Sequence, residues 1–379
     1  MDIHCVFPNF NADPDDPASY DFALTDEYIA AIEAAGAKVF YRLGESIEHS
    51  AKKYYIHPPA DNKQWARICE GIIRHYNEGW ADGHHYNIQY WEIWNEPDNL
   101  TPVMWTGTPL QFFQLYETTA NHLKSKFPDI KIGGYAGCGF PPLHEKNKHW
   151  YDFFEDFLKY ISSPEHRAPL DFFSWHRYSD NPDIVLASAA HARERLNAYG
   201  FTKTESIFNE WNYTSKAVRM RSIEAAAYAA NLMTRLQRET DIALAAYYDA
   251  SFSKYCGLFV PFTNEVYKPY YAFKAFGVLY GLGTEAAIAG DPQGVHALAA
   301  TDGKEGAVLL SNFSEEPKTI KVRLSGLPKG MTATVNLLDA EHDFDAVQTE
   351  TFDTDEPTLT VTLNRYAFAL VTLRKQKNP

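Results

Sequence analysis

The sequence predicts an α/β protein: a (β/α)8-type barrel that lacks its first strand, followed by a C-terminal β-sandwich. Short apolar runs alternate with longer amphipathic segments from residue 1 to about 281, which is typical of a parallel sheet covered by helices. No glycine-rich phosphate loop follows the first run, which argues against a doubly wound dinucleotide-binding sheet. The pattern changes near Gly281-Leu282-Gly283. We therefore expect a catalytic barrel over residues 1–281 and an accessory sandwich over 282–379.

Seven segments of the first part are predicted strands. They are Ile3–Phe7, Lys38–Leu43, Ile88–Trp94, Ile130–Tyr135, Asp171–His176, Ser206–Glu210 and Ala243–Tyr248. Helical spacing of apolar residues lies between them, most clearly in the segment 62–80. The predicted helices are Asp26–Ala35 after the cap Thr25, Asn62–Trp80, Pro109–Phe127, Trp150–Ile161, Asp183–Tyr199, Ser222–Glu239 and Tyr270–Tyr280.

The last part of the chain reads as a series of strands separated by turn signals such as Asp302-Gly303. The predicted strands are Val295–Ala300, Ala307–Asn312, Thr319–Leu324, Thr332–Leu338, Leu359–Leu363 and Ala367–Arg374. A segment of this length and pattern is typical of a small β-sandwich.

Composition excludes several classes of function. A formal charge of −14 and a pI near 5.4 argue against nucleic acid or an anionic membrane as partner, because either needs a basic face. The four cysteines are far apart and form no CxxC pair, which favours reduced thiols. No apolar run has membrane-spanning length, and the first residues carry no secretion signal. We expect a cytoplasmic protein, although a chain without its natural start would read the same.

Two glutamates end predicted strands. Glu96 follows the aromatic run 90–94 in the sequence Asn-Glu-Pro, and Glu210 ends the run Ser206-Ile207-Phe208-Asn209. Carboxyl ends of parallel barrel strands face one pocket, so both carboxylates are expected there. Two facing carboxyl groups are the minimal equipment for cleaving a glycosidic bond. Alternatively, either residue could be a strand-ending cap or a buried ion-pair partner.

These motifs resemble glycoside hydrolase family 39, a family of clan A. The resemblance rests on Trp91-Glu92-Ile93-Trp94-Asn95-Glu96-Pro97-Asp98, on Ser174-Trp175-His176-Arg177-Tyr178, and on Asn209-Glu210-Trp211-Asn212, in this order. It implies a barrel paired with a β-sandwich, with Glu96 as general acid/base and Glu210 as nucleophile. It further implies that Asn95 binds the sugar 2-OH and that His176 and Tyr178 orient the nucleophile and hold sugar hydroxyls.

In that clan the acid/base ends strand four, and the segment Ile3–Phe7 then becomes strand two. The first strand would be absent from this chain. Because an open barrel exposes unpaired strand edges, we expect a partner subunit, giving a homo-oligomer, or a local rearrangement to cover the gap.

Other candidate substrate-binding residues have a structural alternative of similar weight. Arg42 and His4 end or lie in predicted strands, Trp211 and Tyr248 offer stacking surfaces, and Asp249 stands where family xylosidases carry paired glutamates. The pairs His84-His85 and His144/His149 are interpreted as loop residues, since neither has a carboxylate or cysteine at metal-site spacing. No metal and no cofactor are expected.

The resemblance favours a retaining exo-acting β-glycosidase that cleaves β-xylosides, and also β-glucosides, through a covalent intermediate. Two alternatives stay open at this point. One is an α-L-arabinofuranosidase or another clan A glycosidase, and the other is a non-catalytic carbohydrate-binding relic.

Overall fold

The computed structural model describes residues 2–46, 52–139, 148–214, 216, 218–251, 257–263, 265–290, 294–326 and 328–375. The chain divides into two compact units. The first comprises Met1–Arg177, Ala187–Glu210 and Ile242–Ala245, and the second comprises Tyr178–Leu186, Trp211–Asp241 and Ala246–Pro379.

The first unit is built on a six-stranded sheet in the order β1-β2-β3-β4-β5-β6, which is the order of the chain. The strands are β1 Phe40–Leu43, β2 Tyr90–Ile93, β3 Lys131–Gly137, β4 Phe172–Tyr178, β5 Glu205–Asn212 and β6 Ile242–Tyr247. Pairing of β1 with β2, β2 with β3 and β3 with β4 is parallel. Sequential parallel strands joined by helices form a half-barrel, with one strand fewer than the seven that the sequence predicts.

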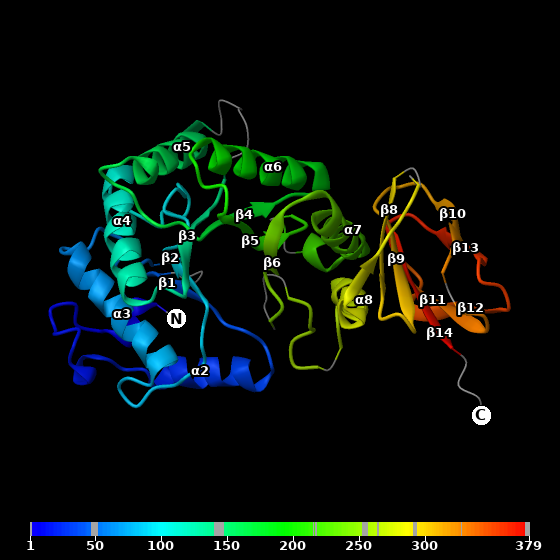
Figure 1. Cartoon of the computed structure of the whole chain (residues 1–379), viewed down its shortest axis with the longest axis horizontal. Coiled ribbons are helices and arrows are strands. Elements are labelled where there is room, and N and C mark those ends of the chain that lie inside the picture. The colour runs from blue at the N-terminus through cyan, green and yellow to red at the C-terminus, as the bar shows by residue number, and fades with distance from the viewer. Residues whose placement is uncertain are drawn as a thin grey trace. The chain divides into compact units, whose positions relative to one another are not determined.

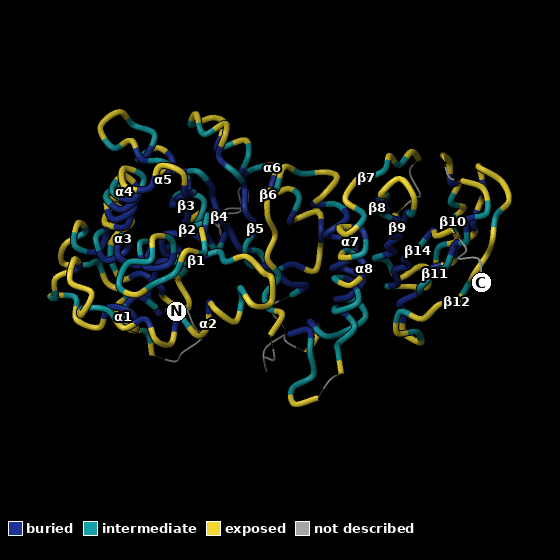
Figure 2. Tube along the Cα trace, turned by 60° about the horizontal axis from the view of Figure 1, so that its bottom comes forward, coloured by how far each residue is buried: buried dark blue, intermediate teal, exposed yellow. Residues whose placement is uncertain are grey.

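Helices cover the outer side of this sheet. Figure 1 shows α3 (Asn62–Glu78), α4 (Pro109–Lys126) and α5 (Lys148–Ser162) following one another around strands β1 to β3. The inward faces of α3 and α4 are buried, as the dark blue stretches in Figure 2 show. Helix α4 starts at a capping box, in which Thr108 and Gln111 exchange hydrogen bonds, so its start is encoded locally. The remaining helices of the α/β part are α2 Ala23–Ala34, α6 Pro182–Ala198, α7 Ile223–Glu239 and α8 Pro269–Leu282.

The predicted strand Ile3–Phe7 is wrong. Residues Ile3–Val6 form a short helix, α1, whose two buried side chains, Ile3 and Val6, lie three residues apart. A short apolar run does not distinguish a strand from a buried helical turn, which explains the error. The predicted cap of the next helix is also wrong: α2 begins at Ala23, no side chain caps it, and Thr25 is buried inside it.

The second unit contains the predicted antiparallel region. One sheet has the order β12-β11-β14-β9-β8-β7, and β10 pairs with β13 in a second. The strands are β7 Thr284–Ala286, β8 Val295–Thr301, β9 Gly306–Asn312, β10 Lys318–Arg323, β11 Met331–Leu338, β12 Asp343–Phe352, β13 Thr358–Leu363 and β14 Ala367–Lys375. Strand β13 alternates exposed and buried residues, with Leu359, Val361 and Leu363 in the core between the sheets.

Helices α7 and α8 of the same unit pack against the larger sheet. The side chain of Ser311 in β9 donates a hydrogen bond to the carbonyl of Ala227 in α7 at 3.2 Å. Every residue of β9 is buried, because it has the sandwich core on one side and these helices on the other. Strand β12 was missed by the sequence reading, since most of its side chains are exposed and its pattern is polar.

The α/β part ends with α8 at Leu282, and the antiparallel strands begin with β7 at Thr284. The division into domains 1–281 and 282–379 stays a prediction. Among the described residues, no helix is long and apolar enough to cross a membrane.

Candidate active site

Glu96 lies just beyond β2, on a tightly bent backbone. Trp94 and Glu96 both have positive φ, 72° and 47°, a conformation that side-chain-bearing residues seldom adopt. The N–H of Trp94 donates to the carbonyl of Leu43 at 2.8 Å, and the N–H of Glu96 contacts the carbonyls of Tyr135 and Ala136 at 3.2 Å. Neighbouring strands on both sides therefore hold the bend that presents Glu96, which is the usual setting of strained functional residues.

Glu96 and Glu210 converge on His176. The Nδ1 atom of His176 lies 2.7 Å from Glu96 Oε1 and 3.6 Å from Glu210 Oε2. One ligand atom from each of the three residues lies within 4.8 Å of the other two. His176 is almost fully buried, whereas the two carboxylates keep about a sixth of their side-chain surface exposed, at 17% and 16%. The two glutamates thus lie close together, and both carboxylates are partly open to solvent.

The charges of this cluster depend on one another. Burial opposes a charge on Glu96, but the hydrogen bond and charge of His176, with a hydrogen bond from Asn99, lower the pKa of Glu96. Burial also opposes a charge on His176, yet Glu210 and Glu96 outweigh it and raise the pKa of the imidazole. In this arrangement the proton of the Glu96–His176 pair rests on His176, within one hydrogen bond of Glu96.

A buried network supports the cluster from the side of β1 and β2. Arg42 Nε donates to Glu92 Oε2, and Asn209 Nδ2 donates to Glu92 Oε1 at 2.7 Å. The guanidinium of Arg42 also reaches His176 Nε2 at 3.4 Å. Glu92 has no exposed surface. Arg42 is therefore a partner of a buried carboxylate, and Glu92 and Asn209 are residues that the sequence reading missed. A glutamate inside an otherwise apolar strand was the available signal.

We expect Glu92→Gln to lower the free energy of unfolding by about 3 kcal/mol, because it leaves the largely buried Arg42 without its charged partner. The loss lies at the low end of the usual range, since Glu210 and Glu96 also lower the energy of the Arg42 charge. Urea denaturation measures it. The control Glu356→Gln breaks an exposed ion pair with Arg323 and should leave the free energy of unfolding close to that of the parent. Equal effects of the two substitutions would contradict the argument.

Asp98 is a second buried acid near Glu96. Its Oδ1 accepts a hydrogen bond from the backbone N–H of Cys138 at 3.1 Å, and Oδ2 has no hydrogen-bond partner among the described residues. Burial, reinforced by the charge of Glu96, raises the pKa of Asp98 to about 7. The folded protein therefore favours the protonated acid.

This shift gives a pH prediction. Because the folded pKa of Asp98 lies above its ordinary value of 3.8, its stabilising effect is present at low pH and is lost as pH rises toward 7. The stabilisation lost over this pH range corresponds to about 4 kcal/mol in the free energy of unfolding. Asp98→Asn should therefore gain stability relative to the parent between pH 5 and pH 8, as measured by urea denaturation at both values. The exposed control Asp353→Asn should show no such gain, and a constant difference for Asp98→Asn would contradict the assignment.

Comparison with known proteins agrees with this geometry. The family model described as glycosyl hydrolases family 39 matches residues 3–214, which include all three residues of the cluster. The chain belongs to glycosyl hydrolases family 39.

Individual relatives have low sequence identity to this family 39 chain. A β-xylosidase of Geobacillus stearothermophilus is 28% identical over 170 residues, 42% of this chain and 31% of that protein, so the match spans about a third of the relative's length. A glucosidase from Croceicoccus marinus has a TM-score of 0.80 at 24% identity, covering 98% of this chain and 86% of the other. A monomeric β-xylosidase from Caulobacter crescentus CB15 has a TM-score of 0.76 at 18% identity, covering 94% and 85%. These structures establish the fold.

Of the other residues predicted for a family 39 site, Asn95 and His4 lie in the first unit. Asn95, next to Glu96, is buried, and its Oδ1 has no hydrogen-bond partner among the described residues. His4 is in α1, where its Nδ1 lies 2.6 Å from Glu45 Oε2. Burial raises the pKa of Glu45 to about 7. His4 is therefore a hydrogen-bond partner of a buried acid that the sequence reading missed.

Glu45 lines a separate cavity of about 760 Å³. Its lining includes Phe10, Tyr55 and His57, and also Trp94, the residue directly before the Asn-Glu-Pro segment. Neither Glu96 nor Glu210 is part of the lining.

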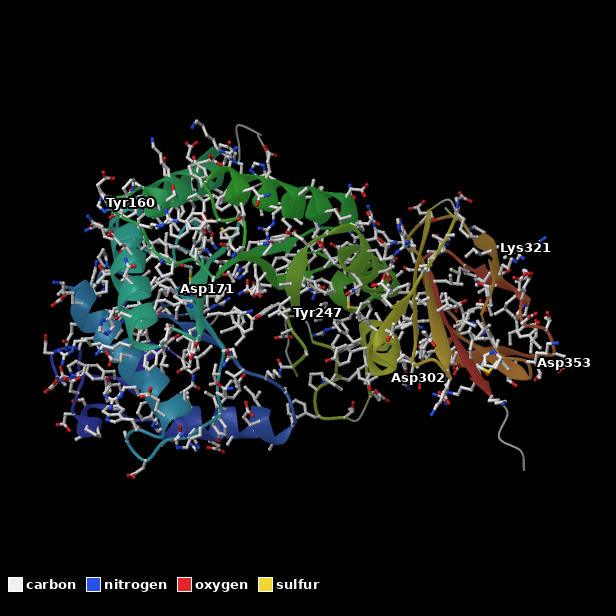
Figure 3. All side chains as sticks on the ribbon, in the orientation of Figure 1. Tyr160, Asp171, Tyr247, Asp302, Lys321 and Asp353 are labelled. Atoms are coloured by element: carbon white, nitrogen blue, oxygen red, sulfur yellow. The ribbon has the colours of Figure 1, made fainter. Side chains whose placement is uncertain are left out.

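Tyr178, Trp211, Tyr248 and Asp249 belong to the second unit. Trp211 is buried against Tyr247, with ring centroids 5.1 Å apart; Tyr247 is labelled in Figure 3. The backbone N–H of Tyr248 donates to the carbonyl of Trp211 at 3.0 Å, and Asp249 Oδ2 accepts a hydrogen bond from Ser251. The core-packing alternative therefore describes Trp211. Roles in sugar binding for Tyr178, Tyr248 and Asp249 stay predictions.

Proposed function

We propose that this family 39 chain is a retaining exo-acting β-glycosidase that hydrolyses β-xylosides, and also β-glucosides, through a covalent glycosyl-enzyme intermediate. The observation that carries the proposal is the convergence of Glu96 and Glu210 on His176, with carboxylate oxygens within 4.8 Å of each other. Retaining glycosidases place their carboxyl groups about 5–5.5 Å apart, whereas inverting enzymes leave several ångströms more for a water molecule. The short separation favours direct attack by a carboxylate.

The proposed reaction uses the single proton of the Glu96–His176 pair. In the first step Glu210 attacks the anomeric carbon, the glycosidic bond breaks, and Glu96 delivers the proton to the leaving oxygen. His176 Nδ1, 2.7 Å from Glu96 Oε1, is the source of this proton and passes it to Glu96 as the leaving oxygen takes it up. In the second step a water molecule loses its proton to Glu96 and its oxygen displaces Glu210 from the sugar. The pair then holds one proton again.

The charge on Glu210 links the two steps. Ionised Glu210 raises the pKa of His176, which keeps a proton available before the first step. Esterification removes that charge, so the pair holds protons less tightly and Glu96 stays ionised to act as a base. The network of Arg42, Glu92 and Asn209 holds the His176 ring and the two carboxylates in position. It takes no part in bond breaking.

The substrate assignment draws on the relatives, one of which is named a β-xylosidase and another a glucosidase. A panel of 4-nitrophenyl glycosides tests it. We expect the largest kcat/KM with β-D-xyloside, a lower value with β-D-glucoside, and values at least about tenfold lower with β-D-galactoside and α-L-arabinofuranoside. A preference for the arabinofuranoside would replace the proposal by the alternative clan A activity. No hydrolysis of any glycoside would favour the carbohydrate-binding relic.

We also propose that a second copy of the chain covers the free edge of the sheet. Support comes from β6, the last strand in the sheet order, where Leu244 is 43% exposed although barrel strands are normally buried. Light scattering coupled to size-exclusion chromatography should report a dimer or larger assembly, and Leu244→Glu should dissociate it. A parent chain that is monomeric at all concentrations would contradict this proposal.

A further inference from the structure

A second group of ligand-type side chains lies away from the catalytic carboxylates. Asp26 on α2, His75 near the end of α3 and His84 in the loop after α3 each place one ligand atom within 4.8 Å of the other two. Asp26 Oδ1 lies 2.9 Å from His75 Nε2 and 3.5 Å from His84 Nε2. Figure 1 shows α2 and the end of α3 side by side, which brings together residues almost sixty positions apart. We propose that these three residues bind a divalent transition-metal ion of the zinc class.

The hydrogen bond on the far side of His75 supports this assignment. His75 Nδ1 lies 3.0 Å from the carbonyl oxygen of Trp80, an atom that only accepts, so Nδ1 carries a proton. With Nδ1 so occupied, Nε2 is the ring atom available to a ligand, and it lies 2.9 Å from a carboxylate oxygen of Asp26. Two acceptors at this distance need a cation between them or a proton on one of them. Orientation of a metal-binding histidine by a backbone carbonyl is the usual arrangement around zinc.

A proton alone would satisfy the Asp26–His75 pair, and His84 is the observation that favours a metal. An imidazolium–carboxylate pair needs no second imidazole, yet Nε2 of His84 also lies 3.5 Å from the same oxygen. Tetrahedral zinc with bonds of 2.0–2.2 Å places its ligand atoms about 3.3 Å apart. The two distances from Asp26 Oδ1, 2.9 and 3.5 Å, lie on either side of this value.

The three residues are held in place without a metal. His75 is buried, and its ring stacks on Phe22 with centroids 3.5 Å apart and planes 5° apart. The backbone N–H of His84 donates to the carbonyl of His75 at 2.6 Å, which fixes the loop against the helix end. Gly83 permits this approach, because a Cβ there would lie 2.1 Å from the carbonyl oxygen of His75. A preorganised donor set loses little conformational freedom when an ion binds.

The chemistry of the donors selects the ion. Two imidazoles and one carboxylate suit Zn²⁺ and its neighbours, whereas Ca²⁺ and Mg²⁺ prefer sites made only of oxygen atoms. Asp26 and His84 are each about 30% exposed, so solvent can supply the fourth ligand. The ion would fasten α2 to the end of α3. This role is independent of the proposed glycosidase activity.

Metal titration of the full chain tests the proposal. Glu96, His176 and Glu210 form another group of possible ligands, so every variant carries Glu210→Gln to weaken that group. After dialysis against a chelator, calorimetry with Zn²⁺ should give one site per chain, with a dissociation constant of about 1 µM or tighter. Zn²⁺ should raise the melting temperature, and Mg²⁺ at the same concentration should not.

Substitutions locate the site. Asp26→Asn and His84→Ala should each weaken Zn²⁺ binding at least about tenfold. His85→Ala, which removes the adjacent histidine outside the group, should bind Zn²⁺ as the parent does. The proposal is overturned if the Glu210→Gln parent binds no Zn²⁺, or if His84→Ala retains the full affinity of that parent, whatever Asp26→Asn does. His84 is partly exposed, so His84→Ala should fold and decides the matter even if Asp26→Asn does not.

Discussion

Replacing Glu210 by alanine should lower kcat/KM for the best aryl glycoside by about 10⁴- to 10⁶-fold, while the fold and the melting temperature stay close to those of the parent. The expected loss is this large because Glu210 is the only group proposed to form a bond with the anomeric carbon. Without it, the reaction has no covalent path, and the distance between the carboxylates leaves little room for a water molecule in its place.

Azide distinguishes loss of the nucleophile from general damage to the site. The Glu210→Ala substitution leaves a space next to the anomeric carbon. Azide should enter this space and restore turnover with an activated aryl glycoside. The product should be the glycosyl azide of inverted configuration, identified by NMR. In the variant one displacement at the anomeric carbon takes the place of the two displacements of the parent reaction. Activity of Glu210→Ala equal to that of the parent would remove the proposed mechanism. Rescue that gives the retained configuration would place the nucleophile elsewhere.

Replacing Glu96 by alanine should have the second largest effect, and the size should depend on the leaving group. General acid catalysis typically contributes about 10²- to 10⁴-fold, so substrates with poor leaving groups should lose this much in kcat/KM. A 2,4-dinitrophenyl glycoside needs no protonation and should lose far less in its first step. Steady-state kinetics with a series of phenyl glycosides gives, for the parent and for Glu96→Ala, the slope of log kcat/KM against the pKa of the leaving phenol. The difference between the two slopes measures the effect.

The pH dependence of kcat/KM provides the corresponding control. In the parent, the proton needed for the first step rests on His176, whose pKa the two carboxylates raise above its ordinary value of 6.5. Activity should therefore persist above pH 6.5 and fall as pH rises through that raised pKa. Glu96→Ala removes the group through which this proton acts, so the alkaline fall should disappear. A variant that keeps the fall, or shows the same loss with every phenol, would contradict the role of Glu96.

Much of the fold was predictable because its signals are local. The apolar run before Asn95 predicts a strand, which is β2 in the structure. The helical spacing in residues 62–80 predicts a helix, which is α3. Ile3–Phe7 failed because five apolar-rich residues fit a helical turn as well as a strand. Strand β12 failed for the opposite reason: it is exposed at the edge of its sheet, so no hydrophobic pattern marks it.

The sequence alone predicted that Glu96 and Glu210 lie in one place, because both follow strands, and parallel order brings strand ends to one edge of a sheet. Only the tertiary structure decided what surrounds them. His176 contacts both glutamates, and Glu92 forms an ion pair with Arg42. His84, in the loop after α3, contacts Asp26 on α2. Spacing along a chain reports contacts within one element. Where a proton rests, or where an ion can bind, depends on distances between elements that the packing of helices on the sheet sets.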